Sequence, residues 1–410
     1  MRILQINNFE AISGGSDRVY QLSTRLLLDR GHEVATLACG DQSFDTRKHT
    51  VLLKPNGYFE HNLLATARNI RNFIYRPEAA RALEVILENF RPDVVHLHIF
   101  YGQLSSSVLR SLRTAGVPTV MTVHEYRMLC PVSTLFSKRL GICERCAGGN
   151  YHQAVLHRCN RNSLAISLLS ALESKIRDRY FNYLEYVDHF FMVSRFCLNK
   201  HLQYLPAIAA KSSVLYNFVE TTLHKDTLTA QRHFLYCGRL SHEKGIVMMC
   251  EVFSKRPTSV LLIAGDGSLN EELRARFGSL TNIRFLGKLG TEPLQACIRE
   301  AWFTIAPSEW YENNPMAILE SFSQGTPVIG ARIGGIPELV IHDGTGLLFE
   351  PSNPSSLDEA LNVAESLTDQ ERRKIANQAL ALVSEQHSAD HHFNQLIAGY
   401  DAAISSHLSL

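Results

Sequence analysis

The residues best suited to chemistry lie in the segment 305–351. Glu312 follows a short apolar strand, in a loop, and Glu320 lies eight residues later. A helix is predicted to begin near Pro315, where a missing N–H costs least. The start of a helix favours a phosphate through its unpaired N–H groups and its dipole, whereas a glutamate there needs a different partner, such as a sugar or ribose hydroxyl. The two glutamates therefore predict a ligand in which a sugar is linked to a nucleoside diphosphate.

Two cations earlier in the chain fit the same ligand. Arg239 and Lys244 follow the predicted strand HFLYCG and precede a predicted helix. Two positive charges at such a place suit a diphosphate, and they can offset the charge that grows on a departing nucleotide. The alternative is that both belong to surface ion pairs.

The elements around these residues alternate between strand and helix. The strand that begins at Arg2 runs into Gly14 and Gly15, and an amphipathic helix, predicted over 17–30, leads to the strand VATLAC. This order is the βαβ unit of a doubly wound parallel sheet. Glycines let the backbone come close to a ligand because they carry no Cβ. The glycine pair is therefore a second candidate for ligand binding, and an ordinary turn without a ligand is the alternative.

Histidines mark the ends of two further predicted strands. His96 and His98 alternate onto one face of the strand VVHLHIF, and His124 directly follows the strand 118–123. Ligands of doubly wound sheets bind beyond the carboxyl ends of the strands. His124 is therefore a candidate site residue, with structural hydrogen bonding as the alternative. We interpret His96 as a core histidine with satisfied hydrogen bonds.

The segment that carries the two glutamates resembles the nucleotide-sugar site of retaining glycosyltransferases, in particular glycosyltransferase family 4, which has the GT-B fold. The resemblance extends over nearly the whole chain. It rests on motifs that occur in one order, namely Gly238-Arg239-Leu240 with Lys244-Gly245, Pro307-Ser308, Glu312-x7-Glu320, Gly325-Thr326-Pro327-Val328-Ile329, Gly334-Gly335, Glu338 and Gly344-Thr345-Gly346-Leu347-Leu348.

The resemblance implies an α/β protein with two doubly wound, Rossmann-like domains that face each other across a cleft. We expect an acceptor-binding domain over 1–218, with a four-cysteine loop at about 130–159. A nucleotide-sugar-binding domain is expected over 219–385, and a C-terminal helix over 386–410 is expected to cross back to the first domain.

The resemblance also assigns roles to residues. As catalytic residues it implies Glu312, which would hold a sugar hydroxyl, His124 near the transferred sugar, and Arg239 and Lys244 on the departing diphosphate. Pro315 stands where the family often has glycine, so neighbouring amides would have to supply the missing contact. The donor-binding set that it implies is Gly14, Gly15, Arg239, Lys244, Asp266, Glu312, Asn313, Asn314, Met316 and Glu320, with Glu320 on the ribose.

The implied reaction moves a sugar from a UDP- or GDP-sugar to a hydroxyl of a glycan or a lipid-linked acceptor, with retention at the anomeric carbon. Assembly of a surface polysaccharide, such as capsule or lipopolysaccharide, is the expected setting. A nucleotide-sugar epimerase of the same fold and a non-catalytic nucleotide-sugar-binding protein are the alternatives. No nucleic-acid partner and no catalytic metal are expected.

Four cysteines, Cys130, Cys143, Cys146 and Cys159, have the spacing C-x12-C-x2-C-x12-C. In a reducing compartment such a set favours a metal over disulfides, and four thiolates suit a closed structural zinc site. Buried free thiols are the main alternative, and a redox pair or disulfide is a further one.

Charge is distributed unevenly along the chain. Residues 1–218 hold 26 Lys and Arg against 17 Asp and Glu, whereas residues 219–410 hold 15 against 23. The basic half could contact an anionic membrane surface or an anionic acceptor, and a scattered, solvated surface is the alternative. The sequence shows neither a long apolar run nor the features of a signal peptide. We therefore expect a cytoplasmic protein that works in the cytoplasm or at the inner face of the cytoplasmic membrane.

Overall fold

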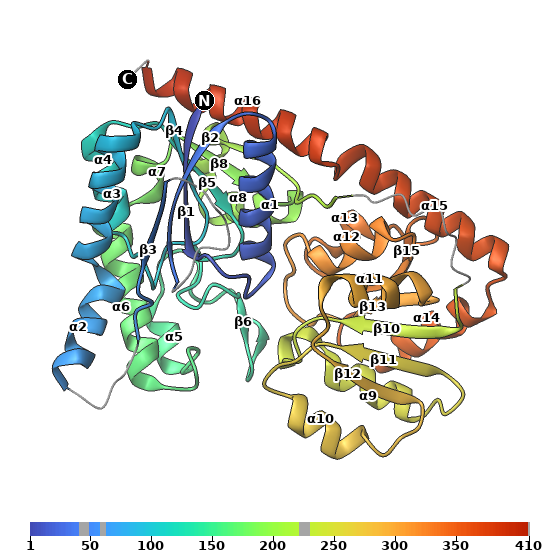
Figure 1. The fold of residues 1–410 in the computed structure, drawn as a ribbon. Helices are drawn as coiled ribbons and strands as arrows, with labels where there is room; N and C mark the ends of the chain where they lie inside the picture. Colours follow the sequence, from blue (N-terminus) through green and yellow to red (C-terminus); the bar gives the residue numbers. More distant parts are fainter. Residues whose placement is uncertain (41–48, 58–62, 221–229, 409–410) are drawn as a thin grey trace. The chain divides into compact units, whose positions relative to one another are not determined.

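The computed structural model describes residues 1–40, 49–57, 63–220 and 230–408, and its chain divides into two compact units (Figure 1). The first unit comprises Met1–Leu135, Glu144–Leu215 and Phe393–Leu410. The second comprises Phe136–Cys143 and Tyr216–His392. The chain thus visits the second unit briefly at Phe136–Cys143, enters it again just after Leu215, and returns to the first unit within its last helix.

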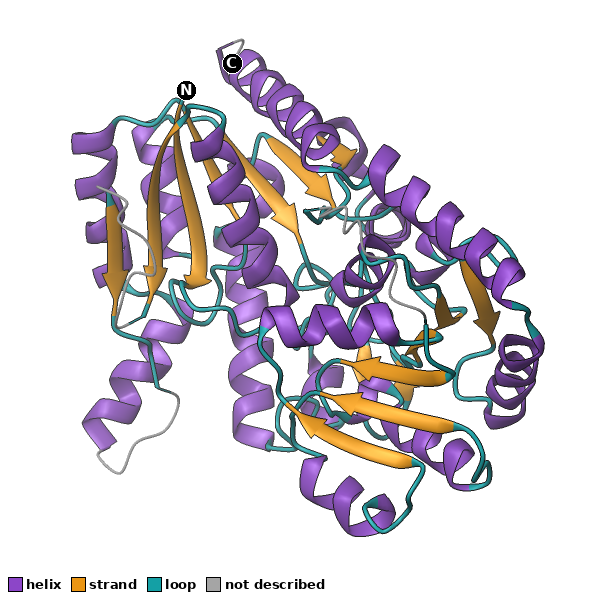
Figure 2. Cartoon of the chain, turned by 45° about the vertical axis from the view of Figure 1, so that its right-hand side comes forward, coloured by secondary structure: helices purple, strands orange, loops and turns teal. Residues whose placement is uncertain are grey.

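The first unit is built on a seven-stranded sheet in the order β3-β2-β1-β4-β5-β8-β9, and every neighbouring pair is parallel. Figure 2 shows these strands side by side with helices along them. The elements are β1 (Arg2–Phe9), α1 (Gly15–Asp29), β2 (Glu33–Cys39), β3 (Thr50–Leu53), α2 (Leu63–Ile74), α3 (Pro77–Phe90), β4 (Val94–Leu97), α4 (Ser107–Ala115), β5 (Thr119–Val123), α5 (His152–Leu156), α6 (Leu164–Tyr180), α7 (Tyr183–Tyr186), β8 (His189–Met192), α8 (Arg195–Tyr204), the 3-10 helix η1 (Pro206–Lys211), β9 (Ser212–Val214) and α16 (Ala389–Leu408).

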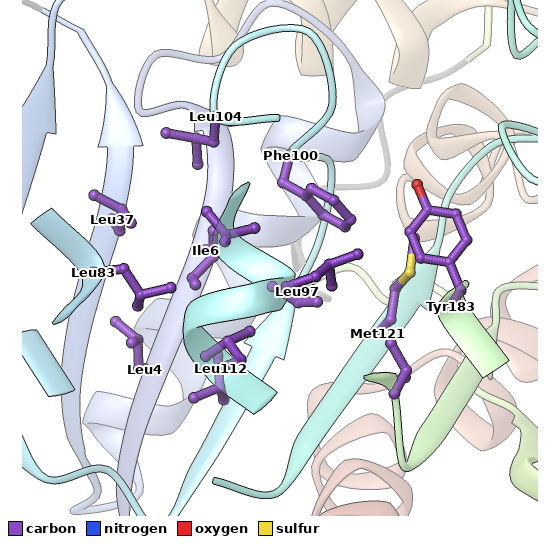
Figure 3. Close-up of a cluster of buried hydrophobic side chains, with 14 of the residues drawn as sticks. Leu4, Ile6, Leu37, Leu83, Leu97, Phe100, Leu104, Leu112, Met121 and Tyr183 are labelled. Carbon is purple, nitrogen blue, oxygen red and sulfur yellow. The ribbon is translucent and has the colours of Figure 1, made fainter. Parts of the chain in front are cut away.

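Both faces of this sheet are buried, as a parallel sheet requires. Leu4 and Ile6 of β1 point to one face, where they join a cluster with α3 and α4 that Figure 3 shows. Ile3 points to the other face, which α1 and the C-terminal helix α16 cover. Gly399 lets α16 lie close to the sheet, because a Cβ there would come within 2.2 Å of the ring of Phe191.

The second unit holds a six-stranded parallel sheet in the order β12-β11-β10-β13-β14-β15. Two parallel sheets with helices along them confirm the α/β class that the alternation of strands and helices predicts. The elements are β6 (Phe136–Ser137), β7 (Gly141–Ile142), β10 (His233–Cys237), the 3-10 helix η2 (His242–Lys244), α9 (Ile246–Ser254), β11 (Val260–Ala264), α10 (Asn270–Phe277), β12 (Ile283–Gly287), α11 (Thr291–Glu300), β13 (Phe303–Ala306), α12 (Met316–Ser323), β14 (Val328–Ala331), α13 (Ile336–Leu339), β15 (Gly346–Phe349), α14 (Pro354–Ser366) and α15 (Asp369–Gln386).

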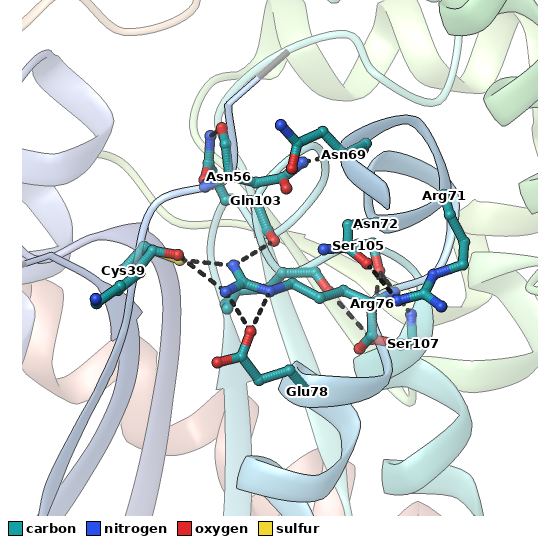
Figure 4. Close-up of polar contacts among 12 residues, drawn as sticks. Cys39, Asn56, Asn69, Arg71, Asn72, Arg76, Glu78, Gln103, Ser105 and Ser107 are labelled. Atoms are coloured by element: carbon teal, nitrogen blue, oxygen red, sulfur yellow. Dashed lines mark hydrogen bonds and ion pairs between the residues drawn. The ribbon is translucent and has the colours of Figure 1, made fainter. Parts of the chain in front are cut away.

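The segment 63–90 before β4 forms two helices. It breaks between α2 and α3, because Pro77 occupies the first position of α3 and disfavours a helical residue before it. Arg76 at the break is buried, and its guanidinium donates to the carbonyls of Lys54 and Gln103 and to Glu78 (Figure 4). This arginine therefore ties together the loops that follow β3 and β4, and it is not part of a solvated basic face.

In the parts of the chain that the structure describes, no helix combines the length and the apolarity needed to cross a bilayer.

Candidate active site

The strand order of each sheet identifies where a ligand should bind. In the second unit the order reverses between β10 and β13, which are neighbours although two strands separate them in the chain. Such a switch point leaves a crevice at the carboxyl ends of the two strands, and this is where doubly wound sheets bind ligands. The loop after β10 carries Arg239 and Lys244, and the loop after β13 carries Glu312. The fold thus brings the predicted cations and the first predicted carboxylate to one edge of one sheet.

Lys244 and Glu312 form an ion pair at this edge. The Nζ atom of Lys244 lies 2.6 Å from Oε1 of Glu312, although 68 residues separate them in the chain. Ser308 donates a hydrogen bond of 2.7 Å to the same oxygen, and the Lys244 ammonium lies 5.2 Å from the centre of the Trp310 ring. The Glu312 side chain is only 9% exposed, whereas Lys244 is 22% exposed. The carboxylate is thus fixed in place, and its cation reaches solvent.

The charge state of Glu312 follows from these contacts. Burial alone would raise the pKa of this carboxyl group, but the Lys244 ammonium and the Ser308 hydroxyl lower it below its usual 4.5. Glu312 is therefore an anion at neutral pH. An ionised, hydrogen-bonded carboxylate is a good acceptor for sugar hydroxyls and a poor general acid.

Arg239 lies in a loop whose backbone is held by the loop after β11. The N–H of Leu240 donates to the carbonyl of Asp266, and the N–H of Gly238 donates to the carbonyl of Ala264. The two loops touch closely, since a Cβ at Gly267 would come within 2.4 Å of the Leu240 carbonyl oxygen. Arg239 and Asp266 are both exposed, so their side chains are accessible to a ligand.

The helix start after Glu312 lies where the sequence predicts it. Helix α12 begins at Met316 with Pro315 as its N-cap and without a side-chain cap. Asn314 is buried and accepts two hydrogen bonds from Asn217: its side-chain oxygen accepts from the backbone N–H, and its carbonyl accepts from the side-chain amide. Burial raises the pKa of the Cys237 thiol, and the negative charge of Glu320 on α12 raises it further. The asparagine contact was not anticipated, and it shows that Asn314 also anchors the start of the second unit.

The predicted residues of the first unit cluster at the carboxyl edge of its own sheet. Gly14 is the N-cap of α1, which begins at Gly15. Buried Asp17 accepts hydrogen bonds from the Asn7 amide, 3.0 Å away, and from the backbone of Ser13. Asp17 thus ties the glycine loop to the end of β1, a role that the sequence reasoning missed.

His124 is half-buried and is hydrogen-bonded to a chain of buried groups. Its Nε2 lies 2.9 Å from Nδ1 of His98, and Nε2 of His98 lies 2.9 Å from the amide oxygen of Gln5. His96 instead contacts the hydroxyls of Tyr400 and Thr122, so its predicted place as a hydrogen-bonded core histidine is confirmed. Gln5 points into this chain from the middle of β1, where no sequence motif marks it.

Two family models cover most of the chain. Residues 12–223 match the model described as Glycosyltransferase Family 4, and residues 221–381 match the model described as Glycosyl transferases group 1. The chain belongs to glycosyltransferase family 4. The motifs of the segment 305–351 thus identified the family correctly.

Relatives of this glycosyltransferase occur in different bacteria. An uncharacterized 42.6 kDa protein in the cps region of Klebsiella pneumoniae is 23% identical over 340 residues, which cover 80% of this chain and 83% of that protein. The uncharacterized glycosyltransferase YqgM of Bacillus subtilis is 23% identical over 304 residues, which cover 72% of this chain and 73% of that protein.

Solved structures share the fold of this glycosyltransferase along its whole length. Anabaena Alr3699/HepE in complex with UDP and glucose superposes with a TM-score of 0.70 and 18% identity, over 98% of this chain and 100% of that chain. The apo form of the lipopolysaccharide outer core galactosyltransferase WaaB gives a TM-score of 0.61 and 18% identity, over 99% of each chain. These similarities confirm the predicted GT-B fold.

The four cysteines of this glycosyltransferase are divided between the two units. Cys143 belongs to the second unit and the other three to the first. Cys146 and Cys159 lie in a small apolar cluster with α5 and α6. Burial raises the pKa of the Cys130 thiol, although the backbone N–H groups of residues 132, 134 and 135 act to lower it. Among the described residues, no three His, Cys, Asp or Glu side chains are close enough to share an ion.

The metal site stays a prediction from the cysteine spacing, and elemental analysis tests it. Protein purified without added metal is expected to carry about one equivalent of zinc, and a Cys143→Ser variant is expected to lose it, since a closed structural site needs all four ligands. Cys197→Ser changes a buried cysteine outside the set and serves as the control. A folded, active and metal-free protein would refute the prediction and leave the cysteines as free thiols.

A further prediction concerns the glycine that supports Glu312. Gly334 has φ of +61°, and a Cβ there would come within 2.3 Å of the Glu312 carbonyl oxygen. Gly287 also has a positive φ, of +73°, but a Cβ added there would have no atom within 4 Å. Gly287→Ala should therefore cost only the backbone strain, about 1–2 kcal/mol, and leave kcat unchanged. Gly334→Ala should cost more stability and lower kcat, because it displaces Glu312. Denaturant unfolding and steady-state kinetics on both variants test this, and equal kcat values would show that Gly334 does not position the carboxylate.

Proposed function

We propose that this protein is a retaining glycosyltransferase that moves a hexose from a UDP- or GDP-sugar to a hydroxyl of a glycan or a lipid-linked acceptor. The observation that carries the proposal is the Lys244–Glu312 pair at the switch point of the second sheet. A fixed carboxylate suits a sugar hydroxyl, and a cation that reaches solvent beside it suits a diphosphate. The pair thus offers complementary partners for the two parts of a nucleotide sugar.

The remaining residues receive roles on the same ligand. Arg239 adds a second cation to the diphosphate, and the amides of Asn313, Asn314 and Met316 at the start of α12 supply N–H donors. Glu320 holds the ribose, and the loop of Asp266 lies near the base. Gly14 and Gly15 face the donor phosphates and the acceptor, and His124 contacts the transferred sugar.

The reaction is a substitution on one face of the sugar. The bond between the anomeric carbon and the diphosphate oxygen breaks, and its electron pair stays on the diphosphate. The acceptor oxygen bonds to the anomeric carbon from the same face, and its proton passes to the departing phosphate oxygen. Lys244 and Arg239 stabilise the charge that develops on this oxygen, which is the part of the reaction that gains most from fixed cations.

We place the reaction in surface polysaccharide assembly, in the cytoplasm or at the inner face of the cytoplasmic membrane. The names of two similar proteins support this setting: one is a protein in a cps region, and the other is a lipopolysaccharide outer core galactosyltransferase. Complexes of Alr3699/HepE with UDP and with UDP-glucose support a uridine nucleotide as the donor.

A donor screen followed by a transfer assay tests the proposal. A thermal-shift panel of UDP-, GDP- and ADP-sugars should show one preferred donor, because only a ligand that binds the folded state raises Tm. That donor should then yield a glycosylated acceptor and free nucleoside diphosphate. Release of free sugar without transfer would favour an epimerase instead. Donor binding without turnover over a broad panel of acceptors would favour a non-catalytic binding protein.

A further inference from the structure

Helix α6 exposes its apolar residues and buries its polar ones. Leu164, Leu168 and Leu172 are 54%, 56% and 49% exposed. Their spacing of four residues places them in one stripe along the helix. The opposite face of α6 is buried, and most of it is polar: Ser167, Ser170, Glu173, Ser174 and Arg177. A helix that only covered a core would show the reverse pattern.

The buried contacts determine this orientation. Glu173 is 2% exposed and forms ion pairs with Arg127 and with Arg177, which is itself 1% exposed. Asn160 donates hydrogen bonds to the hydroxyls of Ser167 and Ser170, at 3.0 and 2.8 Å. Turning α6 to bury the leucines would break this network and would leave its charged groups exposed or without their ion-pair partners. The exposed leucine stripe is therefore fixed by the fold.

The surface around the stripe is positively charged. Lys175 and Arg179 continue the stripe toward the end of α6, and both are exposed. Residues 156–180 hold five Lys or Arg, of which all but the buried Arg177 are exposed, and two Asp or Glu, both of which are ion-paired with arginines. The neighbouring helix α5 adds Leu156, which is 67% exposed. The outer face of α6 thus combines leucines and cations, and no unpaired acid among the described residues of 156–180 opposes them.

We propose that this outer face of α6 docks on an anionic lipid bilayer, with the three leucines in the acyl boundary and Lys175 and Arg179 at the headgroups. Leucines beside cations are what an anionic membrane surface selects. A second copy of the chain fits less well, because two such faces would bring like charges together. Docking at this face would bring the enzyme to a lipid-linked acceptor, and this link to the acceptor rests on the proposed function.

Vesicle flotation with the full chain tests the docking. The wild-type protein should bind phosphatidylcholine vesicles that contain phosphatidylglycerol. It should bind pure phosphatidylcholine vesicles much more weakly. The triple variant Leu164→Gln/Leu168→Gln/Leu172→Gln should partition about 30-fold or more weakly, since it loses apolar burial. The double variant Lys175→Gln/Arg179→Gln should bind anionic vesicles about 10-fold or more weakly than the wild type. Its binding to neutral vesicles should not change. The control Val85→Gln/Ile341→Gln/Val363→Gln removes apolar residues that are 55%, 52% and 45% exposed elsewhere, and it should bind like the wild type.

Two further measurements keep the outcomes distinct. Circular dichroism should show the same fold and Tm for the leucine variant, because its substitutions are on the surface. Wild-type binding by this variant would overturn the proposal. A wild-type dimer that becomes a monomer in the leucine variant, without vesicles, would overturn it in favour of a second copy. Nucleotide binding should be equal in all variants, so failure of the transferase assay would refute the proposed function and leave the docking result intact.

Discussion

Replacing Lys244 with alanine is expected to lower kcat about 100- to 1000-fold and to weaken nucleotide diphosphate binding about 10- to 100-fold. The larger effect on kcat follows because the diphosphate gains negative charge as it departs. Steady-state kinetics and calorimetric titration with the nucleotide measure the two effects. Arg239→Ala should weaken nucleotide binding in the same direction. Lys255→Ala removes an exposed lysine of the same unit and should change neither value.

The same substitution should also reveal the second role of Lys244, its pairing with Glu312. Leaving this buried carboxylate without its cation should cost about 1–3 kcal/mol of stability, less than in a fully buried pair because Lys244 reaches solvent. The double variant Lys244→Ala/Glu312→Gln should recover part of this stability and none of the activity. Unchanged nucleotide affinity in both Lys244→Ala and Arg239→Ala would contradict the diphosphate assignment.

The pH dependence of stability gives an independent check of the pair. The pKa of Glu312 is lowered in the folded state, so its contribution is present above the unfolded pKa of about 4.5 and is lost as pH falls through the folded value. In Lys244→Ala, burial should dominate and raise the pKa of Glu312, which reverses the sign of its contribution. The free energies of unfolding of the wild type and of Lys244→Ala should therefore diverge between pH 4 and 7. On the order of three measurements per pH unit would resolve the two curves.

Glu312→Gln is expected to lower kcat about 100-fold or more while the nucleotide alone binds normally. A carboxylate that grips a sugar hydroxyl more tightly in the transition state affects turnover and leaves the nucleotide contacts intact. A carboxylate that only favoured the helix dipole would be worth about 0.3–1 kcal/mol, and glutamine would replace it with little loss. Glu309→Gln lies in the same loop and outside the predicted site, so it should keep the wild-type kcat.

The stereochemistry of the product distinguishes a clamp from a nucleophile. A nucleophilic Glu312 would form a covalent glycosyl-enzyme when the acceptor is withheld. We expect no such adduct, because a carboxylate already held by Lys244 and Ser308 is positioned and charge-neutralised as a hydrogen-bond acceptor. NMR should show the donor's anomeric configuration retained in the product. An inverted linkage, or a labelled Glu312 peptide in mass spectrometry, would overturn this mechanism.

The sequence by itself determined the fold class, the family and most of the candidate site. Alternating strands and helices dictate parallel sheets, and ligand loops of such sheets follow the strands directly. Arg239, Lys244 and Glu312 could therefore be found from local order alone, because each stands just after an apolar strand. The start of α12 at Met316 follows in the same way from Pro315.

Only the tertiary structure decided which of these residues meet and which face of each helix is covered. The Lys244–Glu312 pair spans 68 residues, and the contact between Gly334 and Glu312 depends on how two loops cross. The leucines of α6 stay exposed because Glu173, on the opposite side of the helix, is held by Arg127, 46 residues away. Periodicity shows that a helix has two unlike faces. Which face is buried depends on partners distant in the chain, because a charge that is buried must keep its ion-pair partner.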